Sequence, residues 1–571
     1  MQVPWVRMSG KRRRDLREYL TAYLMISPAI LLIFVFGIMP VLFALYVSLH
    51  RWLIIRDEYR GIRNYVDAID NFAYLALFAL ALGALVGAYL LLRKTRRQAK
   101  GAKVNPWPLA IPAALHAATA LAFVRWIYVQ LPEFLDIATK MRGQERTREL
   151  FSRLLGEAFF AETVQPAWKL FILLFFAAVV AGFIFRKLLP FADNTKVQSN
   201  LGMVWLLAAI GAGLLFFNFN AIRDAYAQAL ETGTDPGIWP QLTIVVSGVL
   251  LLVVAWRIWR GAERQDSNLQ FVFRIFGAVM LMVGAVMLIV EIPTIVAQGD
   301  QDMWDGLKIT IFFALGTVPV QLSIALGLAV LLFQSIRASG LFRVLFFLPY
   351  VTPAVASATV FRLMFSDRAS SPANRVLSWF GIQAQQWLRE PDGIFEILAN
   401  RFGATNFPAS VLPAWLPVDL SAMLANWLTG PSLALMVVIT LSVWTFVGYN
   451  TVIYLAGLGN IPHEMTEAAE IDGASKWDIF RQITFPLLSP TTYFLSLIGV
   501  MGTFKAFNTI WVLRTGQELG TINTFSVVIF EEFFLKTRYG YASALAFVLF
   551  AIILLLTYFN NRIQGSRVFY G

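Results

Sequence analysis

The chain alternates between long apolar runs and shorter polar segments. Each of twelve runs is about 20 residues or longer, the length that an α-helix needs to cross the hydrocarbon layer of a membrane. The pattern predicts an all-α, polytopic membrane protein. The expected spans are roughly 20–47, 70–92, 106–130, 167–185, 201–220, 239–256, 271–293, 306–334, 344–365, 431–458, 485–512 and 541–561.

Composition supports a membrane protein. Hydrophobic residues make up 58% of the 571 residues and charged residues 14%, so a soluble protein of this length would lack polar surface. The chain has no cysteine, which excludes disulfides, thiolate metal sites and a cysteine nucleophile. Its three histidines (His50, His116 and His463) show no metal-ligand spacing. The net charge of +12 comes from short basic loops beside the spans, so we expect no nucleic-acid partner.

The distribution of Lys and Arg orients the spans. With the N-terminus in the cytoplasm, the cytoplasmic segments hold 24 basic residues in 106 positions and the outer segments 17 in 181. This asymmetry is the one expected of membrane proteins and places both termini in the cytoplasm. The outer loop 48–69 is the exception, with Arg51, Arg56, Arg60 and Arg63.

The chain contains none of the common nucleotide-binding or hydrolytic motifs. It lacks the G-x-x-x-x-G-K-[ST] loop that holds ATP phosphates, and it lacks G-x-S-x-G, H-E-x-x-H and G-x-G-x-x-G. We therefore expect a protein that is not an enzyme and binds no cofactor itself. If ATP drives it, ATP and Mg²⁺ are bound by a partner.

One cytoplasmic segment, 459–484, is amphipathic. It reads GNIPHEMTEAAEIDGASKWDIFRQIT and is followed by FPLLSP. Glu467, Ala468 and Ala469 favour a helix, and Gly473 supplies a turn that other residues reach only with strain. We expect two short helices with a bend, lying at the membrane surface, where small alanine side chains let another protein approach.

This segment resembles the EAA loop of ABC importer permeases. The family pattern is Glu-Ala-Ala followed at fixed spacings by Gly, Ile and Pro. All spacings are kept here, and Phe485 stands where the family usually has Leu. The resemblance assigns ATPase coupling to loop 459–486, with Glu467, Ala468, Ala469, Asp472, Gly473, Ile483 and Pro486. Residues 64–65, 304–333, 346–365 and 427–571 also resemble the maltose/trehalose-type carbohydrate subfamily.

The resemblance implies a MetI-like permease core of six helices, the first and the last five, with a six-helix insertion. The implied parts are 1–69 (basic N-terminus and first core helix), 70–300 (inserted helices), 301–365 (core helices), 366–430 (a folded extracytoplasmic cap) and 431–571 (core helices with the coupling loop).

The resemblance also implies a function and a set of partners. The protein would be the permease subunit of an importer in the cell membrane, translocating maltose, maltodextrin, trehalose or a similar sugar by alternating access. Its partners would be a second permease (MalG-like), an ATPase homodimer (MalK-like), an extracytoplasmic sugar-binding protein and membrane lipids.

Candidate pathway residues lie in two late spans. Ser442, Thr445 and Tyr449 share one helical face. Gly499, Gly502, Thr503 and Ala506 share a face on the next span, where Lys505 is the most deeply placed charge, about eight residues from the outer end. In the family these helices help line the pathway. Close helix packing accounts for the small residues equally well, and that alternative stays open.

Two other functions are open to a polytopic membrane protein of this kind. A twelve-helix secondary transporter driven by an ion gradient would carry more intramembrane carboxylates and an internal two-fold repeat. A membrane glycosyltransferase would show paired catalytic carboxylates in an outer loop. Neither alternative explains the segment at Glu467–Trp477.

The orientation gives a direct prediction. An epitope tag inserted at position 400 is expected to be labelled in intact cells, and a tag at position 475 only after the membrane is opened. Labelling of intact cells at 475 but not at 400 would reverse the topology.

Overall fold

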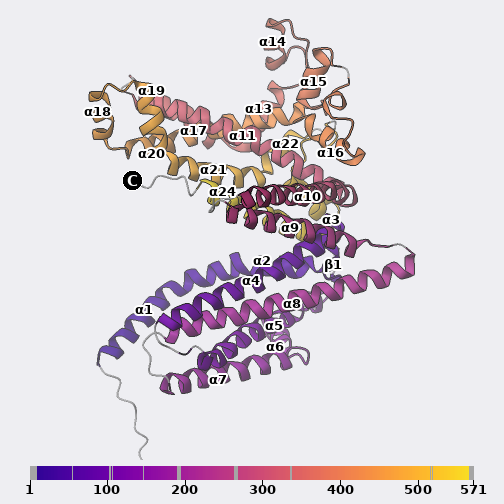
Figure 1. The fold of residues 1–571 in the computed structure, drawn as a ribbon, viewed down its shortest axis with the longest axis vertical. Coiled ribbons are helices and arrows are strands. Elements are labelled where there is room, and N and C mark those ends of the chain that lie inside the picture. Colours follow the sequence, from indigo (N-terminus) through magenta and orange to yellow (C-terminus); the bar gives the residue numbers. More distant parts are fainter. Residues whose placement is uncertain are drawn as a thin grey trace, which may run out of the picture. The chain divides into compact units, whose positions relative to one another are not determined.

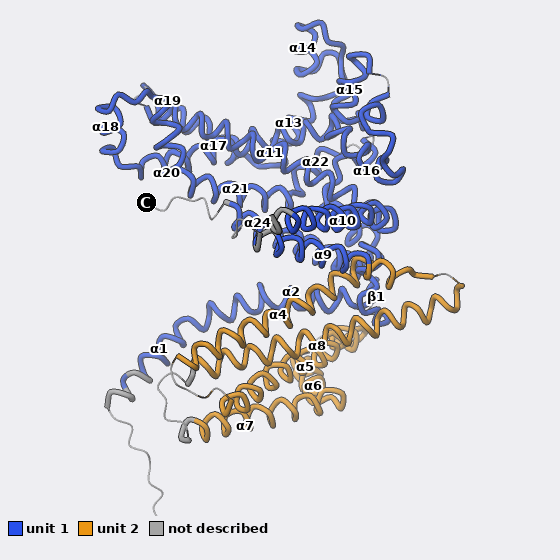
Figure 2. Tube along the Cα trace, viewed as in Figure 1, with its two compact units in different colours: residues 1–70, 244–571 blue, residues 71–243 orange. Residues whose placement is uncertain are grey.

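The computed structural model describes residues 10–53, 56–101, 105, 107–145, 147–188, 194–233, 235–262, 268–334, 337–404, 406–514, 516 and 518–564. Within these ranges the elements are helices joined by turns and loops, together with one short β-hairpin (Figure 1). It divides into two compact units, residues 1–70 with 244–571 and residues 71–243 (Figure 2).

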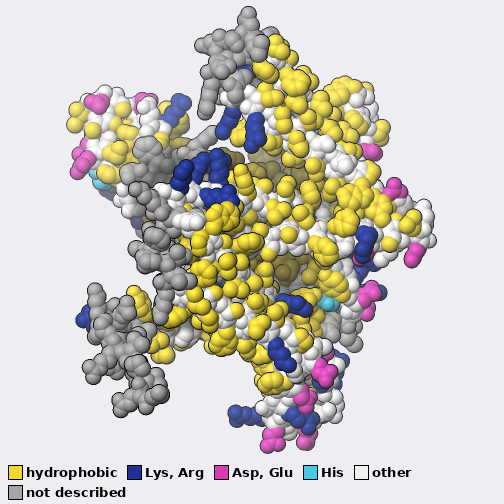
Figure 3. Space-filling model, turned by 60° about the horizontal axis from the view of Figure 1, so that its bottom comes forward, with side chains coloured by type: hydrophobic (Ala, Val, Ile, Leu, Met, Phe, Trp, Pro, Cys, Tyr) yellow, Lys and Arg dark blue, Asp and Glu magenta, His cyan; other side chains and the backbone are white. Residues whose placement is uncertain are grey.

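The described helices confirm a polytopic membrane fold with about twelve spans. Ten are long and apolar enough to cross a membrane, and two bent helix pairs raise the number to twelve. Hydrophobic side chains cover much of the face shown in Figure 3. The ten spans comprise α1 (Gly10–Ile33) with η1 (Phe34–Ile38) and α2 (Met39–Ser48), α4 (Phe72–Gly101), η2 (Trp107–Leu109) with α5 (Ala110–Lys140), α7 (Gln165–Leu188), α8 (Asn194–Thr232), α9 (Ile238–Ala262), α10 (Asn268–Gln298), α11 (Gln301–Phe333), α17 (Leu433–Gly459) and α24 (Tyr539–Gln564).

The span expected at 344–365 is present as a bent pair of helices. The chain forms α12 (Ser339–Val351) and α13 (Ala354–Met364), which meet at an angle of 93°. Pro353 causes the break, because it lacks an amide hydrogen and pushes the residue before it into an extended conformation. Thr352 accordingly has a ψ of 135°.

The span expected at 485–512 is bent as well. The helical segment Lys476–Leu487 meets α21 (Ser489–Phe504) at 60°, and the chain re-forms a helix only at α22 (Asn508–Leu513). Lys505 is therefore an exposed residue at the C-terminal cap of α21, where it does not interrupt an apolar helix.

Helix α17 is the centre of the first unit. It packs against α11, α12, α13, α21 and α22. In its most apolar window 56% of the residues are buried, compared with 39% for α11 and less for every other described span. One buried cluster surrounds its first half, including Phe313, Leu435 and Ile510, and another surrounds Tyr454 and Leu458 near its end.

Helices α12 and α17 approach closely at Gly448. A Cβ atom placed on this glycine would lie 1.7 Å from the backbone oxygen of Phe346. Small residues permit such contacts between membrane helices, whose association depends on van der Waals packing. The rings of Tyr350 and Tyr449 stack beside this crossing, with centroids 4.6 Å apart.

Ionic and polar contacts join the start of α11 to the last helices of the unit, α23 (Phe525–Phe530), η5 (Glu531–Leu535) and α24. The Glu532 carboxylate is 1% exposed and accepts hydrogen bonds from Lys536 at 2.8 Å and from Arg538 at 2.6 Å. Asp300 caps α11 and accepts a hydrogen bond from the Tyr541 hydroxyl. A buried charge bonded in this way avoids much of the cost of an unpaired one.

The first span is attached to the last through a small hairpin. Strands β1 (His50–Trp52) and β2 (Arg56–Tyr59) are antiparallel and are followed by α3 (Arg63–Ile69). Buried Asn64 donates hydrogen bonds to the backbone oxygens of Ser48 at 2.8 Å and His50 at 2.9 Å. A Cβ atom on Gly540 would lie 2.2 Å from the same His50 oxygen, so α24 lies directly against the hairpin.

Segment 366–430 is folded. It forms α14 (Pro372–Trp379), α15 (Ile394–Arg401), η3 (Ala409–Val411) and α16 (Val418–Leu428). Asn374 organises its first part, because its side-chain oxygen accepts from the amide of Gln385 at 3.0 Å and from the indole of Trp387 at 2.8 Å.

The second unit contains α4, α5, α6 (Arg148–Phe159), α7 and α8. Helix α8 packs along α4 and α5, and α7 packs on α5. All six spans expected within 70–300 are present as helices, but α10 and most of α9 belong to the first unit. The compact unit 71–243 is thus smaller than the expected insertion.

The crossing at Gly448 predicts a selective loss of stability. Gly448→Ala is expected to destabilise the chain by about 1–3 kcal/mol, because the added methyl group overlaps the backbone of α12. The matched control is Gly502→Ala, which has no atom within 4 Å of its new Cβ atom. Thermal unfolding of the purified chain, followed by tryptophan fluorescence, should show a lower midpoint for Gly448→Ala alone. Equal midpoints would contradict the tight crossing.

Candidate functional site

The segment after α17 forms a helical elbow. Helix α18 (His463–Ile471) is capped by Asp472 and followed by Gly473, whose φ of +81° lies in the left-handed region that favours glycine. The amide of Ala474 donates to the oxygen of Ala469 at 2.9 Å, and the amide of Gly473 donates to that of Glu470 at 3.0 Å. These two bonds form a Schellman motif, which satisfies carbonyls at the helix end and fixes the direction of the exit.

The second arm of the elbow begins two residues later. Ser475 caps α19 (Lys476–Ile479) in a reciprocal capping box with Asp478. The hydrogen bonds from the Ser475 side chain and backbone lower the pKa of the exposed Asp478 carboxyl. The π-helix η4 (Phe480–Thr484) and α20 (Phe485–Leu487) then lead to α21. The expected pair of short helices with a bend is confirmed.

The predicted coupling residues lie along both arms. Glu467, Ala468, Asp472 and Gly473 are exposed, whereas Ala469, Ile483 and Pro486 are half-buried. Sequence reasoning missed two large apolar neighbours, Ile471 and Trp477, which are 86% and 65% exposed. The signal in the sequence was a large apolar residue on each side of Gly473, Ile471 before it and Trp477 after it. Both lie on the same exposed element as the predicted coupling residues.

The three pathway candidates on α17 have different surroundings. Ser442 is buried, at 7% exposure. The hydroxyl of Thr445 donates to the oxygen of Leu441 at 2.8 Å, within its own helix. Tyr449 is half-buried and stacks on Tyr350 of α12.

The candidates at α21 also differ. Gly499 is packed, since its Cβ position lies 3.2 Å from Val318 and 3.3 Å from the Gln321 amide nitrogen. Gly502 is exposed, and the buried Thr503 donates to the oxygen of its own helix residue Val500 at 2.9 Å. Beyond the helix end, Lys505 is exposed and Ala506 packs against the first buried cluster.

Helix α11 packs against both α17 and α21, and it contributes residues that sequence reasoning missed. Thr317 and Gln321 of α11 and Asn450 of α17 are buried. Each has one side-chain polar atom without a hydrogen-bond partner in the described part of the chain. The available signal was Gln321, a polar side chain within the apolar run 306–334. Polar atoms inside a membrane protein are costly unless paired, so these three side chains make the interior of the bundle a candidate binding region.

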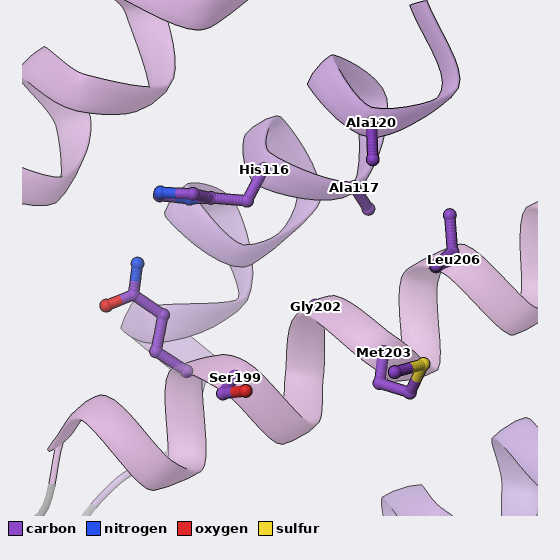
Figure 4. A pocket seen from close by; sticks show the side chains of 8 residues that line it. His116, Ala117, Ala120, Ser199, Gly202, Met203 and Leu206 are labelled. Carbon is purple, nitrogen blue, oxygen red and sulfur yellow. The ribbon is translucent and has the colours of Figure 1, made fainter. Parts of the chain in front are cut away.

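A separate cavity lies in the second unit. Figure 4 shows Ala117 and Ala120 of α5 on one side of the cavity and Gly202 and Leu206 of α8 on the other. The cavity has a volume of about 380 Å³ and contains none of the predicted site residues. His116 lies at its edge, and the Nδ1 atom of its ring lies 2.6 Å from the oxygen of Pro112. No group of three metal-ligating side chains occurs among the residues that the structure describes.

Comparison with known proteins identifies the family. Residues 321–568 match the model of the binding-protein-dependent transport system inner membrane component. A probable ABC transporter permease of Bacillus subtilis, YesP, is 30% identical over 275 residues, which cover 48% of this chain and 75% of that protein. The chain belongs to this permease family. The permease is thus a multi-pass membrane protein and a translocation subunit, and the hydrolysis of ATP is not its own activity.

Other relatives of the permease have named substrates. The sn-glycerol-3-phosphate permease UgpA of Agrobacterium fabrum is 30% identical over 274 residues, covering 48% of this chain and 79% of that protein. The trehalose/maltose permease MalF of Thermococcus litoralis is 25% identical over 267 residues, covering 47% and 76%.

The matched part of the permease begins inside α11 and contains α17, the elbow and α21. The second unit, residues 71–243, lies outside the match.

Proposed function

We propose that the permease is the larger membrane subunit of an ABC importer for a carbohydrate, driven by a separate ATPase homodimer of the MalK type. One observation supports this most directly. The Glu-Ala-Ala pattern lies on an exposed elbow whose bend is held by Gly473, between two helices that continue into the core. A secondary transporter has no need of such an element, and the family assignment does not favour that alternative.

The elbow is the proposed contact with the ATPase. Ala468 presents a small side chain that a groove can approach, and Glu467 is available for a basic residue of the partner. Ile471 and Trp477 supply apolar area on the same element. Because α18 and α19 are both capped, movement of the ATPase displaces the elbow as a unit and biases the permease between inward and outward conformations.

The bundle interior is the proposed solute pathway. Ser442, Gln321 and Asn450 offer polar groups to sugar hydroxyls, and the stacked pair Tyr350–Tyr449 offers an aromatic face to a sugar ring. Relatives are named for arabinooligosaccharides, lactose and trehalose/maltose, which supports a carbohydrate. Maltose, maltodextrin and trehalose are the finer proposal.

The proposed assembly contains a second permease of the MalG type and an extracytoplasmic sugar-binding protein. Both termini and the elbow face the cytoplasm, as the Lys and Arg distribution indicates. Segment 366–430 then lies on the side from which the binding protein delivers the sugar.

The elbow gives the decisive test. Gly473→Pro is expected to abolish transport, because proline fixes φ near −65° and removes the amide that bonds to Glu470. Ala468→Asp is expected to do the same by placing an unpaired charge in the ATPase contact. The measurements are co-purification of the ATPase and sugar-stimulated ATP hydrolysis in the reconstituted complex.

Matched controls separate coupling from folding. Gly473→Asn should retain most of the activity, because asparagine tolerates the left-handed conformation, and Ala468→Ser should keep the contact small. If Gly473→Pro and Ala468→Asp both retain wild-type docking and hydrolysis, the elbow is a simple connector and the proposed coupling is wrong.

The pathway gives a second test. Tyr449→Ala is expected to lower transport and change the preference across a panel of sugars, with a loss of about 1–3 kcal/mol for the lost aromatic and polar contact. Tyr449→Phe keeps the ring and should retain most of the stacking, and Thr503→Ala tests the second helix. Unchanged uptake of every sugar in Tyr449→Ala and Thr503→Ala would leave helix packing as the only role of these residues.

A further inference from the structure

The second unit has a basic stripe at the end of α4, outside the region that matches the permease family. The side chains at positions 93, 96, 97 and 100 recur at helical spacing and are all exposed, whereas Thr95 and Ala99 between them are buried. We call these four side chains the basic stripe. Together with Tyr89 and Leu92 of the same helix, they line a cavity of about 250 Å³: Arg93, Arg96, Arg97 and Lys100.

The four cations have no carboxylate partner. None of them forms an ion pair within the described part of the chain, and residues 89–110 contain no Asp or Glu. They lie in the last turns of α4, where the negative end of the helix dipole favours cations. The stripe is therefore a concentrated positive charge that the neighbouring sequence does not neutralise.

The wall behind the stripe is well packed. Leu92 contacts the buried cluster of Leu109, Ala113, Val197 and Leu201, which joins the beginnings of α5 and α8. The Arg96 guanidinium of the stripe lies 4.9 Å from the ring centroid of Trp107. A cation–π contact of this kind limits the orientations of the guanidinium. The cavity thus has a fixed wall behind its charged residues.

The cavity continues into the apolar part of the same helix. Tyr89 is 63% exposed, and one turn earlier Val86 is 46% exposed, so apolar surface leads away from the charged end. Figure 3 shows Lys and Arg side chains gathered beside a hydrophobic surface. A ligand that fits this arrangement is anionic at one end and apolar at the other. A soluble phosphate would use only the charged end.

We propose that the basic stripe of α4 is a binding site for the headgroup of an anionic phospholipid. Arg93, Arg96, Arg97 and Lys100 bind the phosphodiester and its neighbouring oxygens, because guanidinium groups match phosphate geometry. Leu92 and Tyr89 contact the glycerol and the start of an acyl chain. Basic pockets at the ends of membrane helices bind such headgroups through the same combination of charge and apolar contact.

The test uses the full-length chain in nanodiscs that contain equimolar phosphatidylglycerol and phosphatidylcholine. Native mass spectrometry then counts the lipids retained after the protein is released. Wild-type protein should retain phosphatidylglycerol selectively. Arg93→Gln/Arg97→Gln should weaken that selectivity by about five-fold for each cation removed, and Lys100→Gln alone by about five-fold.

The matched control is Arg142→Gln/Arg148→Gln, which removes the same charge from exposed positions elsewhere in the second unit. It should leave the selectivity unchanged. The proposal is overturned if both double variants lose selectivity equally, or if neither does. Displacement of the bound phosphatidylglycerol by inorganic phosphate would also overturn it, because that result identifies a soluble phosphate ligand.

Discussion

Helix α17 is the element against which the rest of the matched core is packed. Its closest contact is at Gly448, where the absence of a side chain lets the backbone of α12 lie against it. Tyr449, the next residue, is placed in its stack with Tyr350 by the same crossing. Toward its C-terminal end, Tyr454 bonds to Thr492 of α21 at 3.2 Å and joins the second buried cluster. The pathway candidates and the elbow thus depend on the position of one buried helix.

The number and location of the spans could be predicted from the sequence because hydropathy over about 20 residues is a strong local signal. The bend at Gly473 was equally accessible, since a glycine between two capped polar helices has few other uses. The interruptions of the two bent spans were not accessible from hydropathy, because Pro353, Leu488 and Lys505 lie in runs whose mean hydropathy stays high. A span is broken by backbone geometry at one residue, and an average over a window does not detect it.

The pathway residues could be predicted only in part. A helical face such as that of Ser442, Thr445 and Tyr449 follows from periodicity within one segment. Whether a face meets a neighbouring helix depends on contacts between segments far apart in the chain. Gly499 illustrates this, because its close approach to Gln321 of α11 is visible only in the folded structure. The sequence did not show that α11 packs against both α17 and α21, for the same reason.

The capped elbow also has a mechanical consequence. The Schellman bonds at Gly473 and the capping box at Ser475 leave few free torsions between α18 and α19. A turn with so few free torsions bends little under load, so in the proposed coupling a force applied at Ile471 moves α18 and α19 together. In the proposed coupling the elbow therefore acts as a lever, and its stroke is set by the rotation of α17 and α21.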